Sequence, residues 1–181
     1  MAISSTTLSG NQASGGYSSG GAVFTSGGTV TISSCTLNTN QAGSYHAGGA
    51  LLSIDGAVKI IDSSISNNKA SSSYNGGGGA IYTNGGTVTI IGTTLSKNKA
   101  STGAGAIFSS GGTITITGSI VDIVRKKKST GNIFLVSNAF AMFLNVTFEG
   151  NEPVGFFCNS KSLFSNMTTS TNTLFKKTCA G

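Results

Sequence analysis

The chain has 181 residues, enough for at most one ordinary domain. Charged residues make up 9% of it and glycine fills 27 positions, whereas an average globular chain is roughly 25% charged. This composition excludes charge-driven disorder, because Ser, Thr, Asn and Gly keep the chain soluble while Val, Ile, Leu and Phe recur throughout.

Two short motifs recur along the chain at intervals of about 26–30 residues. One is an apolar residue, two variable residues and Asn; the other is Gly-Gly-Ala followed by an apolar residue. Their fixed alternation indicates an internally repeated structure. The first motif stands at 8–11, 37–40, 65–68, 95–98 and 148–151, and the second at 20–23, 48–51, 78–81 and, in a weaker form, 105–107.

Each repeat unit is expected to hold three short strands, which in the first complete unit are 22–25, 29–32 and 35–38. Gly27 and Gly28 supply the positive φ of a tight turn between the first two strands. Alternation in the middle strand turns Val30 and Ile32 inward. The chain is therefore predicted to be all-β, a right-handed single-stranded parallel β-helix of about five to six coils.

Stacked coils place equivalent residues in columns along the solenoid. Leu8, Leu37, Ile65 and Leu95 are expected to form an inward aliphatic column, while Asn11, Asn40, Asn68 and Asn98 form an amide ladder at a corner. Residues 1–151 are predicted to be coils and 152–181 an irregular last coil or partial cap. Further coils are expected in a longer full-length protein.

The net charge of +6 is concentrated late, in the run 125–128 and in Lys176 and Lys177. With no interleaved aromatic residues, this pattern predicts a solvated loop and no nucleic-acid partner. Cys158 and Cys179 can pair in an oxidising compartment, which leaves Cys35 as a buried thiol on a strand. No metal site, cofactor, transmembrane segment or signal peptide is expected from the sequence of this chain.

The paired motifs resemble the repeats of chlamydial polymorphic outer membrane proteins, written GGA[ILV] and FxxN. The matching stretches cover roughly residues 1–151, although only 148–151 carries the Phe and the other copies use Leu or Ile. The resemblance implies a β-helical passenger of an autotransporter-type surface protein acting in adhesion. It places the chain outside the cell or at its surface.

Glycoside cleavage needs two acids at a defined separation. The chain has only five acids in all, spread from residue 55 to residue 152, so enzymatic function is not expected. Asp62 and Asp122 start comparable strands two coils apart, so a carbohydrate-active β-helix stays open as an alternative. Asp55 stands in a glycine turn, where Asp is a structural residue.

A candidate binding surface lies in the loops after the Asn corners, which vary in length. Tyr17, Tyr45 and Tyr74 follow the corners by five or six residues and are expected to form a row with His46 beside it. Such rings suit a glycan or a host-surface protein. Equally, they could only pack on one another and cover the turn.

A second candidate surface is an outward array of threonine pairs, Thr29 with Thr31, Thr87 with Thr89 and Thr113 with Thr115. Flat arrays of this kind resemble the surfaces of ice-binding β-solenoids. In this chain, Ala57 and Lys59 interrupt the array in one coil. The preferred interpretation is a non-enzymatic surface or secreted β-helix acting in adhesion or as a scaffold, with ice binding as a further alternative.

Overall fold

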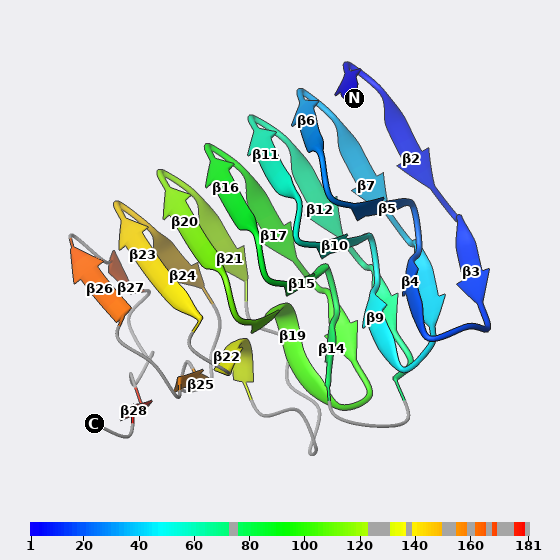
Figure 1. Cartoon of the computed structure of the whole chain (residues 1–181). Coiled ribbons are helices and arrows are strands. Elements are labelled where there is room, and N and C mark those ends of the chain that lie inside the picture. Colours follow the sequence, from blue (N-terminus) through cyan, green and yellow to red (C-terminus); the bar gives the residue numbers. More distant parts are fainter. Residues whose placement is uncertain are drawn as a thin grey trace.

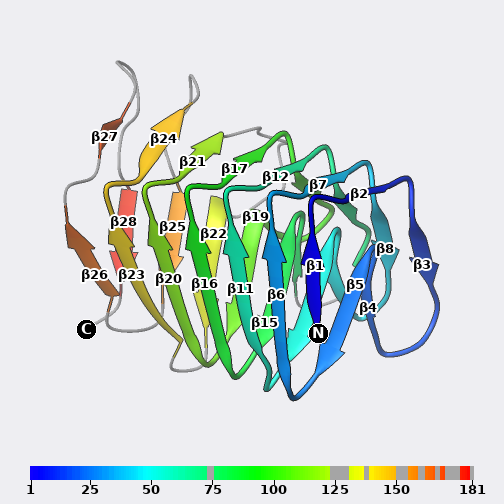
Figure 2. The same ribbon diagram turned by 90° about the horizontal axis from the view of Figure 1, so that it is seen from above.

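The structure is a computed structural model of the whole chain, shown in Figures 1 and 2. It describes residues 1–72, 76–122, 131–136, 139–149, 155–158, 162–165, 168–169 and 176–179. Side chains are described in 1–72, 76–122, 133 and 139–148.

The described chain is all-β and winds into a solenoid of about five turns, as predicted. Every strand pairing within the described residues is parallel, and each strand pairs with its equivalents in the coils above and below (Figure 1). The right-handed sense of the coil stays a prediction from the usual hand of parallel crossovers.

Four parallel sheets run along the solenoid, and we name them A to D. Sheet A holds β1 (Ala2–Ser4), β6 (Thr29–Ser33), β11 (Ala57–Ile61), β16 (Thr87–Ile91), β20 (Thr113–Thr117), β23 (Phe140–Leu144) and β26 (Ser162–Ser165). Sheet B holds β2 (Thr7–Ser9), β7 (Thr36–Asn38), β12 (Ser64–Ser66), β17 (Thr94–Ser96), β21 (Ile120–Asp122), β24 (Thr147–Glu149) and β27 (Thr168–Thr169).

Sheets C and D form the side of the coil that follows the Asn corner. Sheet C holds β3 (Gln12–Ser14), β8 (Gln41–Gly43), β13 (Lys69–Ala70) and β18 (Lys99–Ala100). Sheet D holds β4 (Ser18–Gly20), β5 (Val23–Ser26), β9 (His46–Gly48), β10 (Leu51–Ile54), β14 (Gly77–Gly78), β15 (Ile81–Asn84), β19 (Gly103–Ser110), β22 (Gly131–Val136), β25 (Gly155–Cys158) and β28 (Lys176–Cys179).

The prediction of three strands per coil is wrong, since the first complete coil has five, β5 to β9. The two additional strands lie in the segment that the sequence marked as a variable loop. Their backbone pairs from coil to coil, and their small inward residues form a separate buried cluster of Ala42, Ala47, Ala70 and Ala100. Polar, glycine-rich composition hid these strands, because alanine is the only apolar side chain that they bury.

The main core lies between sheet A, sheet B and those strands of sheet D that follow one another from β5 through β10 and β15 to β19. Leu37, Ile65 and Leu95 are fully buried register partners, and the column continues through Val121 to Phe148, while Leu8 packs on it half-buried. The predicted aliphatic column is confirmed. Val30, Val58, Val88 and Ile114 form a parallel inward column from sheet A.

The Asn corner is built as predicted, as a ladder of amides. Asn68 Oδ1 accepts hydrogen bonds from Asn40 N and Asn40 Nδ2, both at 2.9 Å. Asn68 Nδ2 donates to Asn98 Oδ1 at 2.9 Å and also to the carbonyl of Leu37 at 2.9 Å. Each rung thus braces the next one and the strand of the coil before it, which explains why Asn recurs at 11, 40, 68 and 98.

Another corner carries a hydroxyl ladder that the sequence did not reveal. Backbone N–H groups donate across coils from Cys35 to Ser63 Oγ, from Ser63 to Thr93 Oγ1 and from Thr93 to Ser119 Oγ. Cys35 is buried as expected, but it begins this ladder directly before β7 and does not lie within a strand. The residue before each rung takes a left-handed φ, as at Ser34, Asp62, Gly92 and Gly118.

The Gly-Gly-Ala motif is explained by close approach of backbones. A Cβ on Gly48 would lie 1.8 Å from the carbonyl oxygen of Leu51, and a Cβ on Gly49 would lie 1.9 Å from the carbonyl oxygen of Gly79. The first glycine therefore lets β9 turn tightly into β10, and the second lets neighbouring coils stack there. No larger residue fits either position without moving backbone.

The two late cysteines occupy matching positions on neighbouring strands. Cys158 ends the described part of β25 and is the register partner of Cys179 in β28. The register brings their backbones together, and their disulfide pairing stays a prediction.

Candidate functional site

The structure brings three of the four predicted binding residues together on one edge of the solenoid. The rings of Tyr17 and Tyr45 stack with centroids 5.0 Å apart and planes 20° apart. His46 meets the Tyr45 ring edge-on at 5.4 Å and the Tyr17 ring at 6.0 Å. Tyr74, the fourth predicted residue, lies outside the described residues.

Two further rings that the sequence analysis missed extend this group inward. His46 lies 5.2 Å from Tyr82, and Tyr82 stacks on Phe108 at 5.1 Å with planes 7° apart. We call Tyr17, Tyr45, His46, Tyr82 and Phe108 the aromatic edge. The group runs from a fully buried ring to Tyr17, which is 72% exposed.

A signal for the missed rings was present in the sequence. The residue directly after each Gly-Gly-Ala-apolar motif is itself large and apolar: Phe24, Leu52, Tyr82 and Phe108. These positions are register partners on the outer face of sheet D. Leu52, Tyr82 and Phe108 are buried there, with Ala104, as a hydrophobic cluster outside the main core. An apolar residue on both faces of one strand indicates cover on both faces.

A hydrogen bond fixes the middle of the aromatic edge. Tyr82 Oη lies 2.7 Å from His46 Nδ1. Burial raises the pKa of Tyr82 to about 12, so the phenol keeps its proton at any ordinary pH. Burial also lowers the pKa of His46 below its usual 6.5, which favours the neutral imidazole. The hydrogen-bonded pair of Tyr82 and His46 is therefore uncharged at neutral pH.

Asp62 and Asp122, the two acids considered as a pair, stand at different places in the coil. Asp62 is an exposed corner residue with φ 46°, in the position that Gly92 and Gly118 take in later coils. Asp122 ends strand β21 and is the register partner of Glu149. The expectation that Asp62 and Asp122 occupy comparable positions is wrong. Asp62 lies at the corner before sheet B, whereas Asp122 lies at the end of a strand of sheet B. Asp55 lies in a turn with φ 50°, as expected.

Other candidate sites are limited by what the structure describes. Among the described residues, no group of three His, Cys, Asp or Glu side chains could hold a metal ion. In that same part of the chain, no helix is long and apolar enough to cross a membrane. The basic run 125–128 lies outside the described residues.

The threonine array is real but interrupted. On sheet A, Thr87 and Thr89 are register partners of Thr113 and Thr115, and their side chains are exposed or half-buried. One coil earlier, Ala57 and Lys59 take these places, and one coil later Phe140 and Met142 do. Uninterrupted threonine pairs thus meet across only one pair of neighbouring coils in the described sheet.

One stretch of the chain matches a known family of repeats. Residues 62–84 match the Chlamydia polymorphic membrane protein repeat. This stretch holds one copy of each motif, at 65–68 and 78–81, and the β-solenoid around it supports the resemblance read from the sequence. The repeat family is associated with β-helix proteins of the outer membrane and cell surface. Comparison with the curated proteins and with the solved structures gave no match.

Proposed function

We propose that this chain is a non-enzymatic β-helix of a cell-surface or secreted protein, and that its aromatic edge mediates adhesion. The observation that carries the proposal is the stacked pair Tyr17 and Tyr45, raised on the coil edge with Tyr17 72% exposed. Exposed planar rings contribute large contact area to glycans and proteins at low entropic cost.

The architecture supports this role because the edge is anchored. His46 is hydrogen-bonded to Tyr82, which is itself stacked on Phe108 and 2% exposed. Rings held by a rigid scaffold lose little freedom on binding, so more of the contact energy appears as affinity. The match to a surface-protein repeat favours a partner outside the cell, either a glycan or a host-surface protein.

The test measures retention of the purified chain on a glycan array and on a panel of immobilised host-surface proteins. The double variant Tyr17→Ser, Tyr45→Ser should lose about tenfold or more in apparent affinity, since exposed aromatic rings dominate such contacts. Met142→Ser is the matched control, because Met142 is also an exposed large side chain, at 38%, but lies on sheet A. Equal retention of wild type and double variant would contradict the role of the edge, and no retention of wild type would favour a scaffold.

Ice binding is the second candidate, favoured only by the aligned threonine pairs of β16 and β20. A thermal-hysteresis measurement at roughly millimolar protein decides it, because stacked threonine ladders act only as an extended flat array. The interruption by Lys59, which is exposed, predicts no activity. The remaining candidate is a carbohydrate-active β-helix that binds or cleaves a polysaccharide, and the separation of Asp62 and Asp122 along the coil disfavours cleavage.

A further inference from the structure

Lysines gather beside the Asn corner, where the chain passes from sheet B to sheet C. Lys69 in β13 and Lys99 in β18 are register partners in neighbouring coils, and both are exposed. Lys97 precedes Lys99 by two residues, at the left-handed turn of the corner, and is exposed as well. We call Lys69, Lys97 and Lys99 the lysine cluster.

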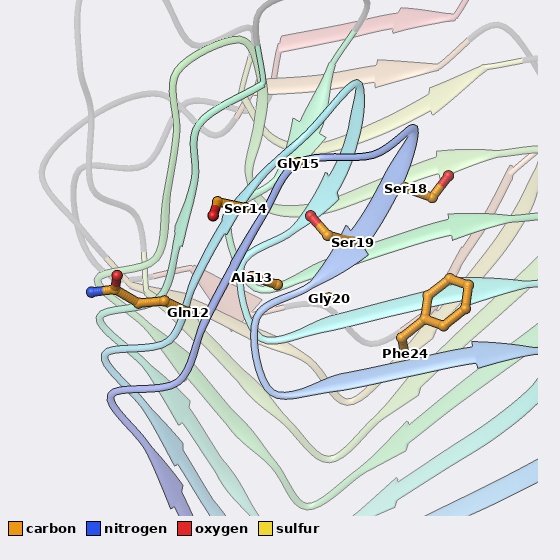
Figure 3. A pocket seen from close by; sticks show the side chains of 8 residues that line it. All are labelled: Gln12, Ala13, Ser14, Gly15, Ser18, Ser19, Gly20 and Phe24. Atoms are coloured by element: carbon orange, nitrogen blue, oxygen red, sulfur yellow. The ribbon is translucent and has the colours of Figure 1, made fainter.

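The earlier coils carry uncharged residues at the same places. Gln41 is the register partner of Lys69, and Gln12 is the register partner of Gln41. Figure 3 shows the side chain of Gln12, the first member of this column, on the outside of the coil. The left-handed turn that holds Lys97 is taken in the earlier coils by Gly10, Thr39 and Asn67. The coil therefore does not need lysine at any of these places.

The lysine cluster costs the fold free energy in two ways. Register partners on neighbouring strands lie about 4.8 Å apart, and like charges that face each other there repel. Lys97 has a φ of 54°, which is unfavourable for a residue with a Cβ. Within the described residues, no acid forms an ion pair with the cluster, and this includes Asp122 at the end of β21, the strand beside β17. The repulsion is thus not offset there.

The backbone under the lysine cluster is fixed by the amide ladder. Asn98, between Lys97 and Lys99, is buried, and its Oδ1 accepts hydrogen bonds from Asn68 N at 3.0 Å and Asn68 Nδ2 at 2.9 Å. Lys99 N donates to the carbonyl of Asn68 at 2.8 Å. A ligand that bridges the ammonium groups therefore has only side chains to order, which lowers the entropic cost of binding.

We propose that the lysine cluster binds an acidic polysaccharide, whose closely spaced sulfate or carboxylate groups neutralise the three ammonium groups. The inference goes beyond the adhesive role of the aromatic edge and does not depend on it, because it concerns other strands and a charged ligand. It assigns a return, in the bound state, for the free energy that the cluster costs the free protein.

The rest of the outer face of sheet C favours this class of partner. The residues that alternate with the inward alanines there are Gln12, Ser14, Gln41, Gly43, Lys69 and Lys99. Their amides and hydroxyls can donate to and accept from sugar hydroxyls. None of them is aromatic, so this face offers no ring on which a nucleobase could stack. None is large and apolar, so it has nothing to insert into a lipid bilayer.

The experiment titrates the full chain into fluorescently labelled heparin and follows the anisotropy at several salt concentrations. In the variant Lys69→Gln, Lys97→Asn, Lys99→Gln, each lysine is replaced by a residue type that an earlier coil already holds at that place. Its affinity for heparin should be about tenfold or more below that of wild type at low salt. The salt dependence of binding should also become shallower, since fewer counterions are released.

The charge-matched control is the variant Lys126→Gln, Lys127→Gln, Lys128→Gln, which removes the same number of positive charges outside the described residues. Its loss in affinity should be about threefold or less. Equal losses in the two variants would assign the binding to net charge and overturn the proposal. So would the absence of heparin binding by wild type at low salt, or equal binding of neutral dextran. Tighter binding of single-stranded DNA or of phosphatidylserine vesicles than of heparin would assign the cluster to another partner and overturn it as well.

Chemical unfolding at low salt tests the argument from cost. The variant that replaces the lysine cluster should unfold at the wild-type midpoint or slightly above it, because the repulsion between Lys69 and Lys99 is removed. A clearly lower midpoint would show that the lysines stabilise the fold, and the proposal would then lose its physical basis.

Discussion

The Asn corner and the aromatic edge are both columns of stacked side chains, yet they obey different rules. At the corner, Asn40, Asn68 and Asn98 are at most 4% exposed, and Asn40 and Asn68 each donate to the amide oxygen of the next coil. At the edge, tyrosine, histidine and phenylalanine follow one another and exposure rises to 72% at Tyr17. Directional hydrogen bonds between buried groups demand one residue type, whereas ring stacking tolerates exchange and leaves room for a binding surface.

The largest effect is expected for Asn68→Ala, which removes a rung from the corner. It leaves Asn40 N–H, Asn40 Nδ2 and the Leu37 carbonyl without their partners inside the protein. The free energy of unfolding should fall by about 3–5 kcal/mol, since each buried unmatched group costs roughly 1–3 kcal/mol. Chemical denaturation measures it, with Lys69→Ala as the exposed neighbouring control.

Replacing a single tyrosine of the edge should cost less than the loss of that rung. Tyr17→Ala removes a ring that is mostly in solvent, so its unfolding midpoint should stay near that of wild type. Equal midpoints for Asn68→Ala and Tyr17→Ala would refute the amide-ladder account of the corner.

A second large effect is expected at Gly49, in the Gly-Gly-Ala motif between β9 and β10. Gly49→Ala places a methyl group 1.9 Å from the carbonyl oxygen of Gly79 and should destabilise the fold by about 3 kcal/mol, because backbone must move to admit it. Gly43→Ala is the matched control, since a Cβ there meets nothing within 4 Å. Thermal unfolding compares the two variants, and similar losses would show that glycine is needed for chain flexibility and not for close approach.

A smaller effect is expected at the buried end of the edge. Tyr82→Phe keeps the stack on Phe108 but removes the hydroxyl that is hydrogen-bonded to His46 Nδ1. The loss in unfolding free energy should be about 1 kcal/mol, the usual net value of one hydrogen bond. Tyr17→Phe, at an exposed ring, serves as the control and should change nothing measurable. If both variants unfold alike, the hydrogen bond does not anchor the edge.

The smallest effect is a pH dependence that belongs to His46. Its pKa is lowered in the folded protein, so the unfolded chain binds a proton more readily. The stability that comes from the neutral imidazole is therefore fully present above the unfolded pKa of about 6.5 and is lost as the pH falls through the folded pKa. Unfolding midpoints from pH 7 down to about 5 should decline slightly in wild type and less in His46→Asn. An identical decline in both would assign the effect to other groups.

The repeat, and with it the solenoid, could be predicted from the sequence because identical environments in stacked coils call for identical residues. The inward column through Leu37 and Ile65 and the ladder through Asn40 and Asn68 were both found this way. The match of residues 62–84 falls on a stretch that carries both motifs. Regular spacing was enough here, since each of these side chains is matched by an equivalent in the next coil.

The candidate site could be predicted only in part. The stacking of Tyr17 and Tyr45 and the place of His46 followed from their similar spacing, five or six residues, after the Asn corner. The anchor Tyr82 did not, because it comes from the next coil and lies 36 residues from His46 in the chain.

By itself, therefore, the sequence determined the coil, its turns, its inward columns and its amide corner, all of which repeat with the chain. Only the tertiary structure decided that the segments after the corner are strands and that Asp62 and Asp122 stand at different places in the coil. It also decided that rings from four coils meet in one edge. The physical reason is that a repeating pattern records what equivalent residues share, whereas a binding surface is built from the residues by which neighbouring coils differ.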